Sequence, residues 1–317
     1  MTSARVRLGL VGCGRLAELG YAQAAAASER VEIVAVADPS TERTAAVRRA
    51  AIEATAGRVE PVAFGGHDEM VNAAELDAVV VASPVDTHAP IVEAVTAARH
   101  PVLVEKPPAR DGDGARRLAA LGGTVWVGFN RRFVPALAAM RNRVAGIDGY
   151  RSELLISYRR ASWSPITVTD DALLDVGPHL IDLARWLHTD DVVEIVDVTV
   201  QPAYASFQLR LRRGRASIEV VTDGVYRERV AVTDDTGRSM AEYQVGGAAA
   251  AVAGRLAGRS GGDVLAGSLL VQLDAFAAAV ADSQRANYGL GTVADGIAVM
   301  DVVDAVRAHA SNERIPT

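Results

Sequence analysis

Two kinds of hydrophobic pattern alternate along the first third of the chain. Short β-branched runs occur at residues 6–12, 31–38, 77–83 and 101–106. The segments between them are rich in alanine and carry charged residues at helical spacing. Strands and helices that alternate in this way predict a parallel sheet with helices on both faces.

The pattern changes beyond about residue 124. Runs typical of strands then follow one another, most of them separated by short turns with Gly, Asp or Pro, at residues 150–158, 193–201, 204–211, 215–222, 226–233 and 238–245. Such close succession leaves no room for crossover helices, so this part should form a largely antiparallel sheet. We therefore predict an α/β protein with two domains, the first at 1–123 with the parallel sheet and the second at 124–317 with a largely antiparallel, open sheet.

Three helices are predicted in the second part. Residues 178–188 have an apolar face, and alanine-rich segments at 263–282 and 292–310 form two longer helices. Residues 246–262 are low in complexity and predict a loop. We expect the last helix to pack back on the first domain.

Composition and charge narrow the possible partners. Of 317 residues, 50% are hydrophobic, and the net charge is -6 with paired arginines scattered along the chain, which argues against nucleic acid. We find too short an apolar run for a signal peptide and no run of roughly 18 continuous apolar residues, so a cytoplasmic protein is expected. Cys13 is the one cysteine, so it cannot form an intrachain disulfide or a cysteine metal cluster, and we predict a buried filler and no metal.

The stretch "LVGCGRLAEL" at 10–19 fits a dinucleotide-binding fingerprint. Gly12, Gly14 and Ala17 match G-x-G-x-x-[GA], in which the glycines permit a tight turn and close approach of backbone to phosphate. Asp38 lies at the end of the second predicted strand, where a carboxylate can accept hydrogen bonds from ribose hydroxyls. The alternative is a simple glycine turn with Asp38 as a helix cap.

Asp38 also affects which dinucleotide is expected. Its charge would repel a 2'-phosphate, which favours NAD. Ser40 and Arg43 follow closely and could bind that phosphate if Asp38 turned away, so NADP stays possible.

Two further segments carry groups that could do chemistry. Lys106 follows the fourth predicted strand, at the sheet edge where ligands bind, and can donate to a substrate oxygen; the alternative is a surface lysine. In "LLDVGPHLIDL" (173–183), Pro178 is expected in a first helical turn, with Asp175 and His179 four residues apart on one face. A carboxylate beside an imidazole suits a group that takes and returns an alcohol proton; the alternative is a capping aspartate with a surface histidine.

At this point the chain resembles a known family. "VGCGRLAELG", "VLVEKPPA" and D-x-G-x-H some 70 residues later are similar to the glucose-fructose oxidoreductase / inositol dehydrogenase / rhizopine catabolism (Gfo/Idh/MocA) family. The resemblance implies a Rossmann domain joined to an α/β domain whose open sheet often serves in oligomerisation. It also implies use of NAD or NADP to oxidise or reduce a carbon of a sugar, cyclitol or similar polyol.

The resemblance implies roles for individual residues. It assigns catalysis to Lys106, Asp175 and His179. It assigns the dinucleotide to Gly12, Gly14, Arg15, Leu16, Asp38, Glu105 and Lys106, with Ser83, Pro84 and His88 on the nicotinamide side. Besides the catalytic set, Arg132 and Trp163 are candidates for substrate contact. The chain departs from the family in "TDDALLDVG" and "SPVDTH", which concern the substrate side.

Several candidates keep a second interpretation. His88 is expected as a structural or cofactor-edge hydrogen-bonding group rather than an acid or base. Arg131 and Arg132 are either a solvated pair or anion contacts, and Trp163 either stacks on a sugar face or packs within its loop.

The leading hypothesis is an NAD(P)-dependent dehydrogenase or reductase of a sugar, cyclitol or similar polyol. It would bind its substrate between the domains and form a homo-dimer or homo-tetramer through the C-terminal sheet. The alternatives are a non-catalytic dinucleotide-binding regulator and an NAD-dependent lyase or glycosidase without net redox change.

Overall fold

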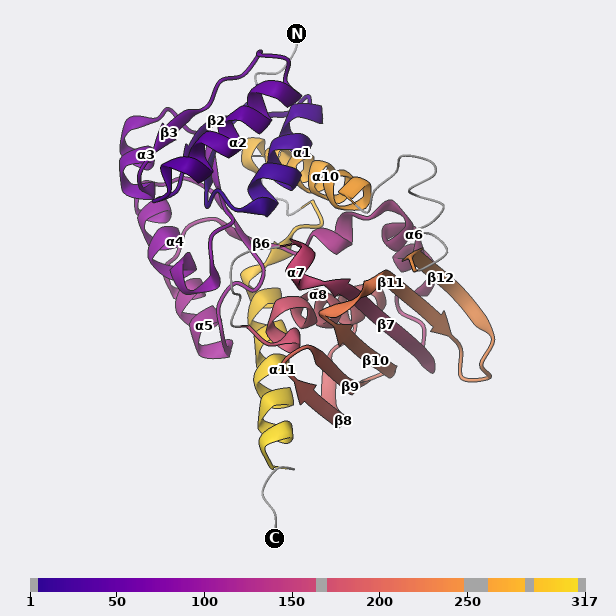
Figure 1. Ribbon diagram of the computed structural model, residues 1–317. Helices are drawn as coiled ribbons and strands as arrows, with labels where there is room; N and C mark the ends of the chain where they lie inside the picture. Colours follow the sequence, from indigo (N-terminus) through magenta and orange to yellow (C-terminus); the bar gives the residue numbers. More distant parts are fainter. Residues whose placement is uncertain (1–4, 164–169, 248–261, 283–287, 313–317) are drawn as a thin grey trace. The chain divides into compact units, whose positions relative to one another are not determined.

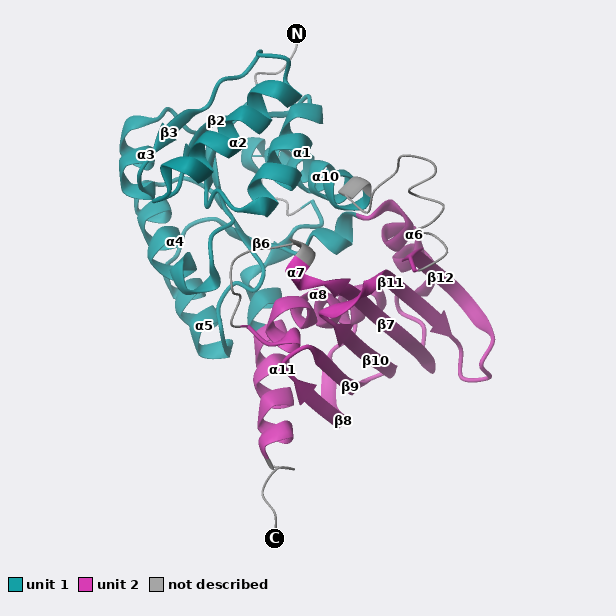
Figure 2. Cartoon of the chain, viewed as in Figure 1, with its two compact units in different colours: residues 1–133, 262–297 teal, residues 134–261, 298–317 magenta. Residues whose placement is uncertain are grey.

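A computed structural model of the chain describes residues 5–163, 170–247, 262–282 and 288–312 (Figure 1). The chain forms two compact units (Figure 2). Unit 1 comprises Met1–Phe133 and Gly262–Ile297, and unit 2 comprises Val134–Gly261 and Ala298–Thr317.

The sheet of unit 1 is a Rossmann sheet. Its strand order is β13-β6-β5-β4-β1-β2-β3, and every neighbouring pair is parallel except β13–β6. The strands are β1 (Val6–Val11), β2 (Val31–Ala37), β3 (Val62–Phe64), β4 (Ala78–Val81), β5 (Val102–Glu105), β6 (Val125–Gly128) and β13 (Gly291–Thr292). The order reverses between β1 and β4, which is the switch point where such sheets bind ligands. The predicted parallel sheet is confirmed.

The helices of unit 1 follow the parallel strands, and those up to α5 lead to the next strand along the chain. They are η1 (Ala17–Tyr21, a π-helix), α1 (Ala22–Ala27), α2 (Thr41–Ala54), α3 (His67–Ala73), η2 (Val85–Thr87), α4 (His88–Ala97), α5 (Gly112–Ala120) and η3 (Asn130–Phe133). Strands β4 and β5 are buried along their whole length, as expected for a sheet covered on both faces.

Helix α10 (Gly262–Ala281) returns to unit 1 from late in the chain. Leu269, Leu273 and Phe276 are fully buried, and Phe276 meets Trp126 of β6 edge to face with ring centroids 5.7 Å apart. The predicted boundary at 123/124 therefore differs from that of the compact units, because β6 and α10 complete the first core.

Helix α10 also bears on the membrane expectation. Its residues Val264–Ala281 are long and apolar enough to cross a membrane by length and composition, which the search for continuous apolar runs did not indicate. The same helix supplies Leu269 and Phe276 to the core of unit 1. Packing within the protein therefore accounts for part of its apolar character.

The sheet of unit 2 has the order β12-β11-β7-β10-β9-β8. Its strands are β7 (Tyr150–Arg159), β8 (Val192–Gln201), β9 (Tyr204–Leu211), β10 (Gly214–Val221), β11 (Asp223–Thr233) and β12 (Ser239–Gly246). The pairing is antiparallel except between β10 and β7, which confirms a largely antiparallel sheet. Residues 248–261 of the predicted loop lie outside the described part.

Helices α6 (Pro135–Val144), α7 (Arg160–Trp163) and α8 (Ala172–His188) belong to unit 2. Helix α8 begins six residues before Pro178, because Asp171 caps its start by accepting from Leu174 N at 2.8 Å. The expectation that Pro178 lies in the first turn is therefore wrong. Pro178 stands inside the helix, where it cannot donate to the carbonyl four residues earlier.

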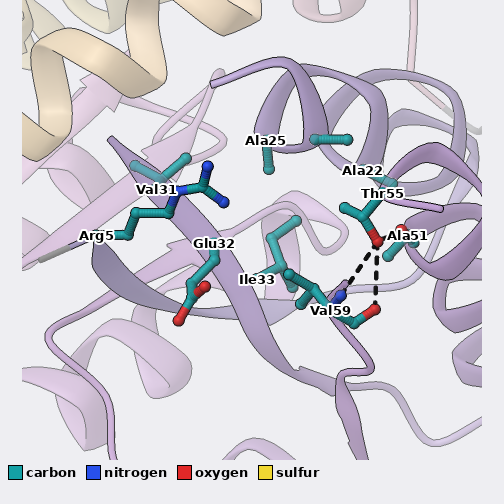
Figure 3. A pocket seen from close by; sticks show the side chains of 10 residues that line it. Arg5, Ala22, Ala25, Val31, Glu32, Ile33, Ala51, Thr55 and Val59 are labelled. Carbon is teal, nitrogen blue, oxygen red and sulfur yellow. Dashed lines mark hydrogen bonds between the residues drawn. The ribbon is translucent and has the colours of Figure 1, made fainter. Parts of the chain in front are cut away.

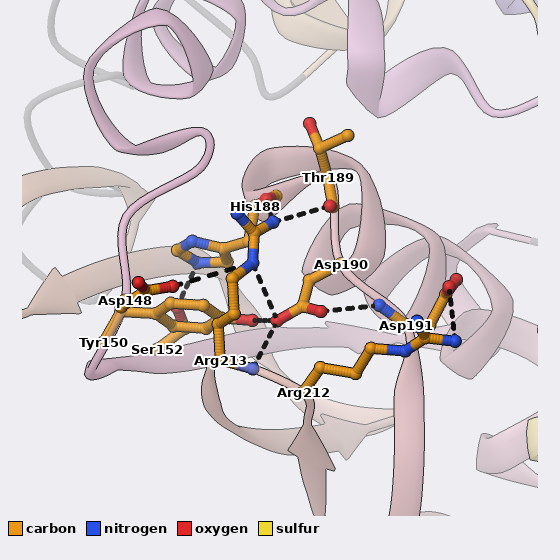
Figure 4. A network of polar contacts seen from close by, with 9 residues as sticks. All are labelled: Asp148, Tyr150, Ser152, His188, Thr189, Asp190, Asp191, Arg212 and Arg213. Atoms are coloured by element: carbon orange, nitrogen blue, oxygen red, sulfur yellow. Dashed lines mark hydrogen bonds and ion pairs between the residues drawn. The ribbon is translucent and has the colours of Figure 1, made fainter.

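A buried polar network fastens the end of α8 to the sheet (Figure 4). The ring of His188 stacks on Tyr150 of β7 with centroids 3.5 Å apart, and its Nε2 lies 2.7 Å from Ser152 Oγ. Tyr150 OH and Arg213 N both donate to one oxygen of Asp190, at 3.0 and 2.9 Å. Burial lowers the pKa of His188 to about 4, so the ring is neutral at pH 7. These contacts lie at the C-terminal end of α8, beyond Asp175 and His179.

The last helix, α11 (Val293–Asn312), is shared between the two units. Its first residues belong to unit 1, where a Cβ on Gly296 would stand 3.1 Å from the Pro108 side chain. Residues from Ala298 onward belong to unit 2. The packing of this helix on the Rossmann domain stays a prediction.

Candidate active site

The loop after β1 uses its two glycines for different purposes. Gly12 has φ +93°, and an added Cβ would lie 2.5 Å from Ser83 N, so the backbone itself requires glycine here. An added Cβ at Gly14 would meet no protein atom within 4 Å. The chain therefore leaves open space in front of Gly14, at the start of the first helix, where amide N–H groups and the helix dipole favour a phosphate. These features fit the pyrophosphate of a dinucleotide.

Asp38 is held at the end of β2 beside this loop. Its Oδ2 accepts from Cys13 N at 2.9 Å and its Oδ1 from Ser40 N at 2.8 Å. Ser40, not Asp38, caps helix α2 by accepting from Arg43 N, so the helix-cap alternative for Asp38 is wrong. Burial and the Asp38 charge raise the pKa of the Cys13 thiol to about 12, which agrees with the predicted inert filler.

The remaining predicted cofactor residues surround the same strand ends. Arg15 is exposed and Leu16 packs against the core. Ser83 Oγ accepts from Thr87, and exposed Pro84 accepts from Thr87 N at 2.9 Å at the start of η2. Their contact with a nicotinamide stays a prediction.

His88 serves as a structural hydrogen-bonding group. Its Nε2 lies 2.9 Å from Ser83 O and its Nδ1 3.4 Å from Pro108 O, which ties the β4 loop to the loop after β5. Burial lowers the pKa of His88, which favours the neutral ring. The shorter contact assigns the ring proton to Nε2, which then donates to Ser83 O. The structural interpretation of His88 is therefore favoured over an acid or base.

Lys106 stands directly after β5, half-buried, and is the one lysine of the chain. Every other member of the 33 lysines and arginines is an arginine, whose guanidinium does not release its proton in proteins. The preceding residue, Glu105, is buried and accepts from Tyr21 OH and from Lys106 N. The single lysine, a signal that the motif search overlooked, is thus placed at the ligand-binding edge of a Rossmann sheet.

Asp175, in the first turn of α8, is surrounded by two groups that the sequence search missed. Tyr158 OH donates to its Oδ2, and Arg160 Nε donates to the same oxygen at 2.9 Å. Arg160 also donates to Asp170 O at 2.6 Å. The Asp175 carboxylate is thus fixed by hydrogen bonds from Tyr158 and Arg160. It is not the helix cap of the alternative interpretation, since Asp171 is the N-cap residue of α8.

His179 lies one helical turn after Asp175 and is only 7% exposed. The alternative of a surface histidine is therefore wrong. An imidazole can take and return the proton of an alcohol, so His179 has the chemistry of a general base. Lys106 belongs to unit 1, whereas Asp175 and His179 belong to unit 2.

The predicted substrate residues other than the catalytic set are less well supported. Arg132 is 7% exposed, lies 3.2 Å from Asp295 Oδ2 and stands over the Phe129 ring, so it is not part of a solvated pair. Arg131 donates to Asn130 Oδ1 at 3.3 Å. Helix α7 ends at Trp163, whose side chain lies outside the described part of the chain.

A hollow in unit 1 offers no second candidate (Figure 3). The Thr55 hydroxyl there donates to Ala51 O at 2.7 Å and accepts from Val59 N. The hollow is lined by Arg5, Ala22, Ala25, Ala26, Val31, Glu32, Ile33, Ala51, Thr55 and Val59. In the described ranges, no three His, Cys, Asp or Glu side chains gather as metal ligands.

Comparison with known proteins identifies the first domain. Residues 6–127 match the Gfo/Idh/MocA family model, described as an oxidoreductase family with an NAD-binding Rossmann fold. The N-terminal domain belongs to the Gfo/Idh/MocA oxidoreductase family. For this domain, the predicted family and the NAD-binding Rossmann fold are thereby confirmed.

Individual relatives extend the Gfo/Idh/MocA likeness. The rhizopine catabolism protein MocA of Rhizobium meliloti is 33% identical over 193 residues, which cover 58% of this chain and 57% of that protein. Inositol 2-dehydrogenase 2 of Saccharopolyspora erythraea is 34% identical over 194 residues, covering 59% of this chain and 55% of its own. These matches thus span little more than half the length of the curated relatives.

The fold likeness covers nearly the whole chain. A scyllo-inositol dehydrogenase structure from Lactobacillus casei, with bound NAD(H) and scyllo-inositol, has a TM-score of 0.79 at 16% identity and covers 98% of both chains. At this identity the likeness shows the fold alone. It agrees with a Rossmann domain followed by a largely antiparallel α/β domain.

Proposed function

We propose that this chain is an NAD-dependent dehydrogenase of a cyclitol, sugar or similar polyol. The observation that carries the proposal is the single lysine of the chain, Lys106, at the carboxyl end of β5 in an NAD-binding Rossmann domain. A chain that uses arginine at every other cationic position keeps an ammonium group here. Its compact, rotatable N–H donors suit a substrate oxygen. The planar guanidinium of an arginine does not replace such an ammonium group.

NAD is favoured over NADP by the position of Asp38. Two backbone amides donate to its carboxylate at the end of β2. To admit the 2'-phosphate of NADP, the Asp38 side chain would have to turn away and both hydrogen bonds would break. The Gly12–Gly14 loop would hold the pyrophosphate and Asp38 the ribose hydroxyls.

The bound nicotinamide would supply the hydride acceptor for a carbinol C–H. The protein must then remove the hydroxyl proton, and His179 is the proposed base. Asp175, held by Tyr158 and Arg160, would orient and stabilise the charged imidazole. Lys106 would donate to the carbinol oxygen and stabilise the negative charge that develops there.

The polyol class rests on the relatives whose printed names are inositol 2-dehydrogenase. A carbinol flanked by further hydroxyls is the common chemistry of cyclitols and sugars. Oligomer formation through the sheet of unit 2 belongs to the same proposal, and native mass spectrometry tests it.

The decisive assay is a panel of cyclitols, sugars and nucleotide sugars incubated with NAD and with NADP. The proposal predicts growth of the NADH absorbance with at least one polyol, and a ketone product two mass units lighter by mass spectrometry. A regulator would bind the dinucleotide without any product. A lyase or glycosidase would give product without accumulation of NADH.

A further inference from the structure

Tyr21 lies at the end of the π-helical turn that follows the glycine loop. In this turn Ala22 N donates to Ala17 O, five residues back, so it holds one residue more than an α-helical turn. The Tyr21 side chain is buried, and its hydroxyl donates to Glu105 Oε1 at 2.5 Å. The helix of the dinucleotide loop is thereby bonded to the end of β5.

The Glu105 carboxyl group also forms a hydrogen bond with the backbone of the next residue. Its second oxygen, Oε2, accepts from Lys106 N at 3.1 Å. Gly128 lies opposite Glu105 on β6, and a Cβ at Gly128 would stand 3.2 Å from the carboxyl group. The sheet thus leaves a space for this carboxyl group, which is 5% exposed.

The charge of this carboxyl group depends on its donors. Burial raises the pKa of Glu105, whereas the Tyr21 hydrogen bond, the Lys106 charge, the Lys106 N–H and the Arg131 charge lower it. Burial and the Glu105 charge raise the pKa of Tyr21 well above its ordinary value, so Tyr21 stays a neutral donor. The phenol is therefore one of the few groups that favour an ionised Glu105 in this dry setting.

We propose that Tyr21 is a positioning residue for Lys106, acting through Glu105. Its hydroxyl fixes the Glu105 carboxyl group, which in turn fixes the Lys106 backbone N–H and places a negative charge beside the ammonium. The dinucleotide loop and the lysine are in this way set by one continuous chain of hydrogen bonds. This proposal rests on the proposed role of Lys106 in the reaction.

The single lysine permits a direct test that needs no turnover. In protein labelled with ¹³C-lysine, Lys106 gives the one lysine Cε–H signal. Tyr21→Phe removes only the hydroxyl, and we expect it to move this signal at constant pH. The matched control is Tyr150→Phe, which removes another buried tyrosine–carboxylate bond, that to Asp190 in unit 2, and should leave the signal in place.

Kinetics supply the second readout. In Tyr21→Phe we expect kcat to fall about tenfold while the Kd of NAD changes by less than about twofold, because the lost hydrogen bond lies behind the lysine. Tyr150→Phe should keep the parental kcat.

The outcomes are separable. An unmoved lysine signal and parental kcat in a folded Tyr21→Phe protein would show that the pair is only structural. If that variant does not fold, Glu105→Gln keeps an acceptor for Tyr21 but alters the oxygen facing Lys106 N, so an unmoved signal there overturns the proposal equally. A parent protein without NADH formation would refute the dehydrogenase assignment alone, since the signal still decides whether Tyr21 positions Lys106.

Discussion

Substitutions at Gly12 and Gly14 should separate folding from cofactor binding within three residues. Gly12→Ala places a Cβ 2.5 Å from Ser83 N on a backbone with φ +93°. A non-glycine residue in such a conformation costs about 1–3 kcal/mol, and the close contact adds to this. Gly14→Val meets open space, so its free energy of unfolding should stay within about 0.5 kcal/mol of the parent value.

The effect on NAD binding should be largest where the effect on folding is small. A valine at Gly14 fills the space in front of the helix start and prevents two amide–phosphate hydrogen bonds, each worth about 1.5 kcal/mol. Together they correspond to a loss of about 100-fold in affinity. Urea unfolding gives the stability and calorimetry the Kd of NAD. A Gly14→Val protein that binds NAD as tightly as the parent would refute the assignment of this loop to pyrophosphate.

Three further predictions concern the ribose, the proton and the buried network. Asp38→Ser should raise kcat/KM with NADP relative to NAD, and an unchanged ratio would mean that Asp38 does not face the ribose. His179→Ala should lower kcat by roughly 10²- to 10⁴-fold and abolish the histidine-like step in the pH profile of kcat/KM. Lys106→Met should also be impaired but should keep that step. The reverse pattern would exchange the roles of the two residues. His188 has its pKa lowered to about 4 in the folded chain, so its contribution to stability is present above pH 6.5 and decreases as the pH falls toward 4. Between pH 7.5 and 5 the parent should lose about 2 kcal/mol of unfolding free energy more than His188→Phe, as urea unfolding would show; equal losses would contradict the burial of a neutral ring.

The strands could be predicted from the sequence wherever burial is periodic over several residues. The predicted strand at 204–211 matches β9 (Tyr204–Leu211), because its inward residues alternate strictly. Strand β3 (Val62–Phe64) was missed, since three partly exposed residues carry no periodicity. The start of α8 was placed too late, because Pro178 resembled a helix start while the true cap, Asp171, lies seven residues earlier.

The candidate site was predicted in its motifs but not in its polar partners. Motif spacing identified Lys106, Asp175 and His179. Tyr21 meets Glu105 across 84 residues of sequence, and Arg160, at the start of α7, meets Asp175 of α8. Such contacts depend on which buried side chains meet once the sheet has assembled. Hydrophobic periodicity does not contain this information.

Hydride transfer itself is the most direct test of the central claim. A polyol that gives turnover in the panel is prepared with deuterium on its carbinol carbons, and the nicotinamide product is analysed by mass spectrometry. The proposed function predicts NADH one mass unit heavier with the parent protein and almost none with Lys106→Met. The account would be contradicted if product formed while the nicotinamide carried no deuterium, because the deuterium stayed in the carbon skeleton or was released to water.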